Sequence, residues 1–333
     1  MKLGFYMATQ WRQGADLGPE LKNLIEQVRV AKASGLASLM VGQHFVSSPL
    51  QMFQAMPLLA RLAAEAEGMR LGPGLLLLPL LNPVIVAEET ATLDWLTGGN
   101  AIIGLGLGYR QEEFDSIGVP FKERVPRFVE GVEVIRKMWR DDVVEHHGRF
   151  HTLSKVQSSV RPKSPGGPPI WVAGDSEPPV KRAAKLADAW FPSPMVSQKG
   201  VAKLNALFRE TRAAAGLKPA SEYPIIRECH VGSGTGKALD EVREPLSFKY
   251  EAYASWGQAT GFVPADRIRA DFDTFAAKRF MIGSASEVVD QIGRYGEHTG
   301  TDHILLRVQW PGLDQKTVVR TLERLGRVVE QLQ

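Results

Sequence analysis

Apolar residues in this chain alternate between two periods. Short continuous apolar runs, bounded by glycine, proline or polar residues, are separated by longer segments in which apolar residues recur every three or four positions. The short runs are typical of parallel strands covered on both faces, and the longer segments are typical of amphipathic helices. The runs that we expect to form strands lie at residues 3–7, 38–42, 71–78, 101–106, 170–173, 189–191, 225–231 and 303–308.

Each expected strand is followed by an expected helix. Turn and capping signals place these helices at residues 20–34, 53–67, 83–97, 124–140, 179–186, 198–215, 285–296 and 315–331. Gly98 and Gly99 stop the third helix, and Ser284 with Glu287 forms a capping box before the seventh. This strict alternation predicts an α/β fold, a (β/α)8 TIM barrel spanning residues 1–333 as a single domain, with a doubly wound parallel sheet as the alternative.

Two segments are longer than a strand–helix repeat requires, and we interpret them as inserted excursions near 141–168 and 235–278. The first is expected to form a small hairpin turning at Gly148, followed by a proline-rich return. The second is expected to be mostly helical and to cover one edge of the site, because over-long loops in compact domains are usually functional.

Composition narrows the class of protein. Of the 333 residues, 44% are hydrophobic and 23% charged, with a formal net charge of +3, which is ordinary for a soluble enzyme and too weakly basic to favour nucleic acid. Cys229 is the single cysteine, so no internal disulfide can form and a reducing, cytoplasmic location is expected. No apolar run reaches the roughly 18 residues of a membrane span, and we expect neither signal peptide nor membrane contact.

His44 is the first candidate for chemistry, because it directly follows the expected strand at 38–42 and barrel active sites lie at strand carboxyl ends. Its imidazole could transfer a proton or polarise a flat heteroaromatic ring, and a structural histidine is the alternative. His230 is a weaker candidate. The histidines of the first excursion are expected to be solvated and to lack metal-ligand spacing, so no metal site is expected.

Glycines mark two further strand ends. Gly106 and Gly108 would let a flat ligand or another backbone approach closely. The Gly-x-Gly-x-Gly spacing at 104–108 does not fit the Gly-x-Gly-x-x-Gly dinucleotide fingerprint. Gly174, Asp175 and Ser176 precede an expected helix, whose N-terminus favours a phosphate, with an ordinary N-cap as the alternative.

Carboxylates raise the alternative of glycoside hydrolysis. Glu112, Glu113 or Asp115 would have to lie ~5–5.5 Å or ~6.5–9.5 Å from Glu228. Glu112 is expected on a polar turn and Glu228 inside a strand, so this hypothesis is not favoured.

Five stretches together resemble the bacterial luciferase-like monooxygenase family, in the family's order and over about residues 1–330. The most diagnostic is AEETATLDWLTGGN at 87–100, which continues into GLGLGY at 104–109 and EF at 113–114. The others are GQHF at 42–45, PPIWVAG at 168–174, KLADAW at 185–190 and FMIGS at 280–284.

The resemblance implies a (β/α)8 barrel that uses reduced FMN with O2, or the deazaflavin coenzyme F-420. It implies that His44 lies beside the flavin ring. It also implies that Gly74 and Leu75 form a strand bulge behind the ring, with a non-prolyl cis peptide near these two residues. The residues that it assigns to the cofactor are Gln43, His44, Gly74, Leu75, Gly106, Gly108, Tyr109, Gly174, Asp175 and Ser176.

The sequence departs from the family's pattern at four positions. Gln43 replaces an acidic residue, Asn100 an arginine and Ala189 a glycine. Tyr109 stands where deazaflavin-dependent sugar-phosphate dehydrogenases of the family have a catalytic glutamate, which argues against that activity.

We therefore expect a two-component monooxygenase that receives reduced FMN from a separate flavin reductase, because no Rossmann-type NAD(P)H site is visible. An F-420-dependent oxidoreductase and a non-catalytic flavin-binding protein are the alternatives. A homodimer is also expected.

The expected substrate is a small apolar or aromatic molecule that could be anionic. This expectation follows from the aromatic and cationic residues at the expected mouth of the barrel, with Arg279 nearby. The alternative is that Trp256 and Trp310 only pack the second excursion onto the barrel. The residues assigned to the substrate are Tyr6, Phe45, Arg307 and Gln309.

Overall fold

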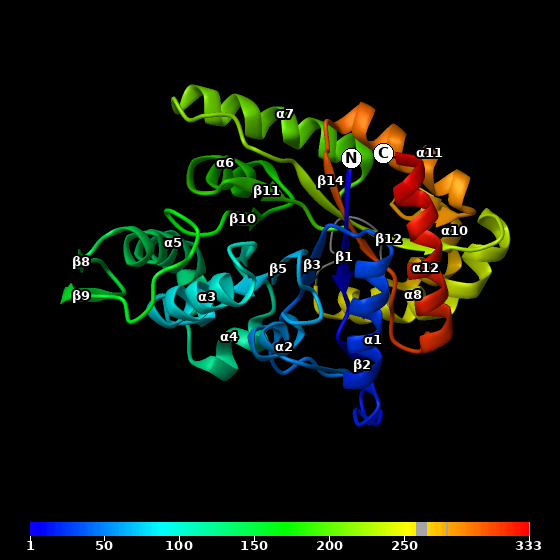
Figure 1. Ribbon diagram of the computed structural model, residues 1–333, viewed down its shortest axis with the longest axis horizontal. Helices are drawn as coiled ribbons and strands as arrows, with labels where there is room; N and C mark the ends of the chain where they lie inside the picture. The colour runs from blue at the N-terminus through cyan, green and yellow to red at the C-terminus, as the bar shows by residue number, and fades with distance from the viewer. Residues whose placement is uncertain (258–264, 278, 333) are drawn as a thin grey trace.

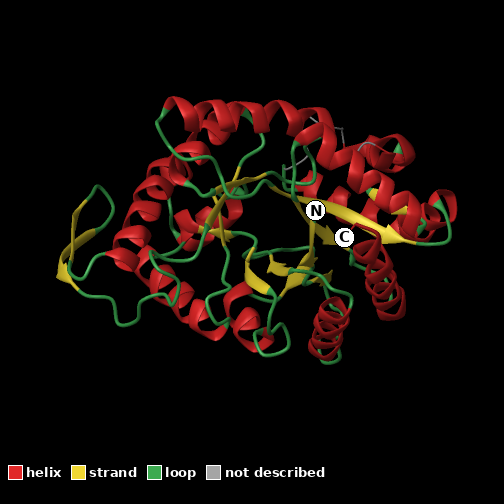
Figure 2. Ribbon diagram, turned by 45° about the horizontal axis from the view of Figure 1, so that its top comes forward, coloured by secondary structure: helices red, strands yellow, loops and turns green. Residues whose placement is uncertain are grey.

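The computed structural model describes residues 1–257, 265–277 and 279–332. Parallel strands form the inner layer and helices surround them (Figure 2), as predicted for a (β/α)8 barrel. In chain order the barrel strands are β1 (Lys2–Met7), β3 (Ser38–Val41), β5 (Arg70–Pro73), β7 (Ile103–Gly106), β10 (Ile170–Ala173), β11 (Ala189–Phe191), β12 (Pro224–Val231) and β14 (His303–Arg307).

Hydrogen-bonded ladders divide these strands into two sheets. With β13 (Met281–Gly283) at its edge, the six-stranded sheet has the order β13-β12-β14-β1-β3-β5. With β6 (Leu76–Leu77) at its edge, the four-stranded sheet has the order β11-β10-β7-β6. A parallel bridge between Leu71 and Ala101 joins the two sheets on one side, and β11 lies against β12 on the other.

The third barrel strand is broken, and this break shapes the site. β5 pairs with β3, whereas β6 (Leu76–Leu77) pairs with β7. Between them, the Gly74–Leu75 peptide bond is cis, which confirms the expectation for this bulge. Gly72 must lack a side chain, because a Cβ there would lie 1.6 Å from the carbonyl oxygen of Ile102.

The outer helices bury one apolar face each against the strands. They are α1 (Glu20–Ala33), α2 (Ala55–Leu62), α3 (Pro83–Leu96), α5 (Arg124–Arg140), α6 (Glu177–Leu186), α7 (Gln198–Ala214), α11 (Ala285–Thr299) and α12 (Gln315–Leu332). The predicted capping box of Ser284 and Glu287 is present at the start of α11. Shorter helical segments are η1 (Leu78–Leu80), α4 (Gln111–Ile117) and η2 (Phe121–Glu123).

The first excursion forms the expected hairpin, β8 (Val144–His147) with β9 (Thr152–Val156). It projects away from the barrel at the left of Figure 1. The Glu130 carboxylate on α5 anchors its turn by accepting backbone N–H groups, at 2.7 Å from His151 and 3.0 Å from Phe150. His146 was expected to be solvated but is 7% exposed, because it packs beside Glu130.

The second excursion is largely helical, with α8 (Thr235–Ser255), α9 (Ala265–Ala270) and α10 (Phe272–Ala277). Part of it, residues 258–264 and 278, lies outside the described residues. No strand was expected between the second excursion and the helix that follows it. The structure has β13 (Met281–Gly283) there, and this strand pairs with the end of β12.

A short antiparallel pair, β2 (Gln10–Arg12) with β4 (Leu50–Met52), corrects the expectation of a polar loop after β1. Trp11 is 6% exposed and packs on Phe53, so this pair carries its own apolar contact. Among the described helices, none is long and apolar enough to cross a bilayer.

Candidate active site

A cavity of about 270 Å³ opens at the carboxyl ends of the barrel strands. Its wall brings together most of the residues that the sequence assigned to cofactor or substrate. Those that line it are Tyr6, Gln43, His44, Gly74, Leu75, Gly106, Gly108, Tyr109, Gly174, Asp175 and Arg307.

Three predicted site residues lie elsewhere. Phe45 packs on the apolar cluster that contains Leu77 and Phe114. Gln309 is buried with no hydrogen-bond partner for its Oε1. Ser176 is the N-cap of α6, and its side chain makes no capping hydrogen bond. Their roles toward a ligand stay predictions.

Glycines keep side chains out of part of the cavity wall. A Cβ on Gly42 would lie 2.4 Å from the Tyr6 hydroxyl, and one on Gly106 would lie 3.0 Å from Leu75 Cδ1. The Tyr6 hydroxyl donates to the carbonyl oxygen of Gly74, at the break in the third strand. Side chains at these glycines would therefore displace the groups that define the wall.

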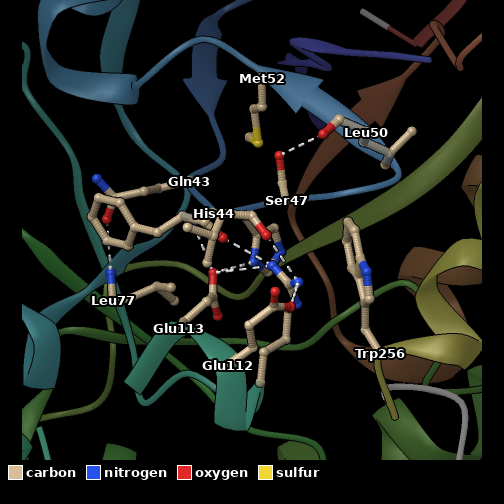
Figure 3. Close-up of polar contacts among 12 residues, drawn as sticks. Gln43, His44, Ser47, Leu50, Met52, Leu77, Glu112, Glu113 and Trp256 are labelled. Carbon is tan, nitrogen blue, oxygen red and sulfur yellow. Dashed lines mark hydrogen bonds and ion pairs between the residues drawn. The ribbon is translucent and has the colours of Figure 1, made fainter. Parts of the chain in front are cut away.

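His44 is held by a carboxylate that sequence reasoning did not assign to this role. Its Nδ1 lies 3.0 Å from Oε1 of Glu113 on α4, which also accepts the backbone N–H of Phe45 at 2.9 Å (Figure 3). A carboxylate partner favours the proton on Nδ1, which leaves Nε2 as the free nitrogen of neutral His44. The Glu113 side chain is fully buried and its Oε2 has no partner.

Arg110 and Trp256 fix the loop that carries His44. The Arg110 guanidinium donates to the carbonyl oxygens of Phe45 at 2.9 Å and Val46 at 3.1 Å. It also lies 4.3 Å from the Trp256 ring centroid, and the Trp256 ring is 5.4 Å from His44. The end of α8 thus covers this edge of the site, as expected of the second excursion.

Gln43 links the second and third barrel strands. Its Oε1 accepts the backbone N–H of Leu77 at 3.2 Å (Figure 3). Its Nε2 donates to the side-chain oxygen of Gln54 at 3.4 Å. The amide thus accepts from a backbone N–H and donates to a side-chain oxygen, which an ionised acid in its place could not do.

Two phenols on the wall are neutral near neutral pH. Burial raises the pKa of Tyr6 to about 12, against the opposing charge of Arg307. Burial also raises the pKa of Tyr109, whose hydroxyl has no hydrogen-bond partner. Tyr109 lines the cavity, and its hydroxyl is left without a partner among the described residues.

The expected phosphate loop is tied to the neighbouring strand. Asp175 accepts from the Ser193 backbone N–H at 3.0 Å and hydroxyl at 2.6 Å, and Trp190 donates to the Gly174 carbonyl at 2.7 Å. Burial raises the pKa of Asp175 even though the Ser193 hydrogen bonds oppose this. Ser176 occupies the N-cap position of α6, but its side chain makes no capping hydrogen bond there.

Arg307 is paired, which the sequence did not reveal. Its Nη1 donates to Glu228 Oε1 at 3.2 Å. Glu228 also accepts from Lys249, Tyr250 and Trp310, which leaves it unsuited to the acid–base role that glycoside hydrolysis would require. Burial alone would raise the pKa of Glu228, but the charges of Lys249 and Arg307 hold it below its ordinary value.

His230 serves the packing of the outer layer. Its Nε2 lies 2.9 Å from Glu241, and its Nδ1 lies 2.8 Å from the Thr321 hydroxyl on α12. Among the described residues, no group of three His, Cys, Asp or Glu side chains is arranged to hold a metal ion.

Two relatives in sequence match the chain to different extents. An uncharacterized protein, y4vJ of Sinorhizobium fredii, is 25% identical over 97% of this chain and 94% of its own length. A phthiodiolone/phenolphthiodiolone dimycocerosates ketoreductase of Mycobacterium kansasii is 32% identical, over only 50% of this chain and 44% of its own length.

Solved structures share the fold. The monooxygenase RslO1 of Streptomyces bottropensis superposes with a TM-score of 0.88 at 23% identity, covering 100% of this chain and 99% of that one. An F-420-dependent secondary alcohol dehydrogenase in complex with an F-420–acetone adduct gives 0.81 at 20% identity, over 100% and 99% of the two chains. The oxygenating constituent of 3,6-diketocamphane monooxygenase of Pseudomonas putida, in complex with FMN, gives 0.80 at 18% identity, over 99% and 98%.

A family model decides the assignment. The model described as luciferase-like monooxygenase matches residues 1–303, a range that contains every lining residue of the cavity except Arg307. The chain belongs to the luciferase-like monooxygenase family.

Proposed function

We propose that this protein is the oxygenating component of a two-component monooxygenase, which takes reduced FMN from a separate flavin reductase and uses O2 to oxidise a small organic substrate. The observation that carries this proposal is a cavity with glycines at the ends of neighbouring strands and the His44–Glu113 pair at its edge. Family membership supports the reaction class.

The cavity suits a flat ring system. Gly42, Gly74 and Gly106 offer no side chains, and Leu75 supplies an apolar surface beside them. The buried Tyr109 hydroxyl, which has no partner in the protein, offers a hydrogen bond to a heteroatom. We assign the remaining cofactor contacts to Gln43, Gly108 and the loop of Gly174, Asp175 and Ser176. Reduced FMN, when bound, would supply the electrons for reaction with O2.

His44 is the proposed catalytic residue. Glu113 holds the Nδ1–H side of the ring, so Nε2 can accept or donate a proton at the cavity. The phenol of Tyr109 stays protonated and can donate without competing for that proton. Tyr6 and Arg307 also line the cavity, and we place the substrate beside them, together with Phe45 and Gln309.

An F-420-dependent oxidoreductase is the second candidate, because the fold is shared with a protein that binds that coenzyme as well as with one that binds FMN. Titration of the purified protein with each cofactor, followed by flavin fluorescence, distinguishes them. Half-saturation by FMN at the lower concentration is expected. Tighter binding of F-420 would overturn the proposed cofactor.

A non-catalytic flavin-binding protein is the third candidate. The protein is mixed with an added flavin reductase, NADH and FMN, and a panel of aromatic and aliphatic substrates is screened for incorporation of ¹⁸O from ¹⁸O2. Labelled product is expected with at least one class. Flavin binding without product across the panel would favour the binder. We also propose a homodimer, which sedimentation velocity tests.

A further inference from the structure

A buried cluster of charges lies behind the cavity wall. Glu228 on β12 and Arg307 on β14 are register partners in neighbouring strands, and Lys249 on α8 reaches the same carboxylate. Oε1 of Glu228 accepts from Lys249 Nζ and, at 3.2 Å, from Arg307 Nη1. The three side chains are at most 6% exposed, so two cations and one anion are held away from water.

The other groups that face Lys249 do not supply a second negative charge. On α8, Tyr250 donates to Glu228 at 2.8 Å, and the ring centroids of Tyr250 and Tyr253 lie 4.6 Å and 5.2 Å from the Lys249 ammonium. On β1, the Tyr6 ring lies 4.4 Å from the guanidinium of the cluster. Burial raises the pKa of all three phenols, so they are neutral. With Lys249 charged, the cluster carries one positive charge unbalanced among the described residues.

Arg307 connects this charge to the cavity. It lines the cavity, is 5% exposed, and its buried Nε–H has no hydrogen-bond partner. Leaving such a donor unsatisfied is costly, and an organic anion in the cavity would pair with the guanidinium and balance the charge of the cluster. Burial, reinforced by the Arg307 charge, lowers the pKa of Lys249 to about 7, so above pH 7 the empty site balances itself by losing the Lys249 proton.

We propose that Lys249 couples the binding of an organic anion in the cavity to the uptake of one proton. The free protein holds neutral Lys249 at mildly alkaline pH. When a carboxylate or similar oxyanion binds at Arg307, a proton from solvent converts Lys249 to the ammonium. If the anion is the substrate, this coupling names the substrate class of the proposed function and rests on that function. Proton-coupled anion binding itself does not depend on it.

The test uses the cofactor-free protein with benzoate and its neutral isostere benzamide as probes. Calorimetric titrations run from pH 6 to pH 9 in two buffers of different ionisation enthalpy, which gives the protons bound per ligand. Benzoate binding is expected to take up close to one proton at pH 8 and to weaken by up to about tenfold per pH unit above pH 7. Benzamide is expected to bind more weakly and without pH dependence.

Lys249→Met keeps the length of the side chain and removes the titrating group. Benzoate binding is expected to weaken at least about tenfold at pH 6 and to lose its pH dependence, while surface variant Lys181→Met behaves as wild type. If Lys249→Met does not fold, proton uptake by the wild type decides alone. Uptake below about 0.2 proton at pH 8, equal affinity for the two probes, or no benzoate binding would each overturn the proposal.

A separate FMN titration distinguishes this inference from the proposed function. Proton-coupled benzoate binding without FMN binding would contradict the flavin proposal alone. FMN binding without proton-coupled benzoate binding would contradict the Lys249 proposal alone.

Discussion

Glu113 Oε1 lies 3.0 Å from Nδ1 of His44 and 2.9 Å from the backbone nitrogen of the next residue. One buried carboxylate therefore fixes both the ring and the main chain that carries it. The two residues act as a unit, so their substitutions should not add.

His44→Ala is expected to lower turnover by about 10²–10⁴, the usual range for a general acid or base, with little change in the free energy of unfolding. Steady-state oxygenation assays with an added flavin reductase give the comparison. A loss of less than about threefold would return His44 to a structural role.

Glu113→Gln is expected to lower turnover by about 10–100-fold, because the amide no longer enforces the Nδ1–H form of His44. Adding it to His44→Ala should cause almost no further loss. Asp115→Asn, on the exposed face of the same helix, is the matched control. Independent, multiplicative effects of the two substitutions would show that Glu113 does not act through His44.

Gly42→Ala is expected to weaken flavin binding, because the new Cβ would stand 2.4 Å from the Tyr6 hydroxyl and force it away from Gly74. Gly236→Ala on α8 is the control, since a Cβ there meets nothing within 4 Å. Fluorescence titration with FMN measures the effect. Unchanged affinity in Gly42→Ala would remove Tyr6 from the wall that the cofactor contacts.

Arg307→Ala is expected to lower kcat/KM for acidic substrates, while flavin affinity is unchanged. The lost transition-state stabilisation should be about 1.5–3 kcal/mol, the size of a charge-assisted hydrogen bond. Because Glu228 keeps Lys249, Tyr250 and Trp310 as donors, the buried carboxylate is not left bare. Arg307→Lys should recover part of the loss. An equal loss of flavin binding would place Arg307 on the cofactor instead.

Acid should destabilise the fold through the buried pair of Glu222 and His303, which lies at the end of the barrel away from the cavity. Burial alone would raise the pKa of Glu222, but hydrogen bonds from His303 and Arg70 lower it to about 2. Burial lowers the pKa of His303 despite Glu222. Both groups bind protons more readily in the unfolded chain, so stability falls as the pH is lowered. The His303 contribution is lost below about pH 6.5, and the Glu222 contribution is lost between about pH 4.5 and 2.

The Glu222 part of this loss amounts to about 3 kcal/mol between pH 4.5 and 2. Glu222→Gln should therefore be less stable than wild type at pH 6, with a gap that narrows as the pH falls toward 3. Urea unfolding at several pH values measures the gap. A constant difference across that range would show that ionised Glu222 has no special stabilisation in the fold.

The barrel was predictable because each of its strands is a distinct apolar run and most of its helices carry caps or stops. The sequence did not predict the short strands β2, β4 and β13. Each has only three residues and pairs with a strand far along the chain. The same limit hid the chemistry: Glu113 is 69 residues from His44, and Glu228 is 79 residues from Arg307. The sequence could place each side chain at a strand end but could not show which ones would meet.

The pairing of β1 has a consequence for how the chain is made. Its residues lie between β3 and β14, with Lys2 opposite His303 and Phe5 opposite Leu306. During synthesis, one edge of the first strand therefore waits for a partner that emerges from the ribosome about 300 residues later. Until then, an unpaired strand edge is open to other chains. A nascent chain stalled before residue 303 should accordingly depend on chaperones far more than the finished protein does.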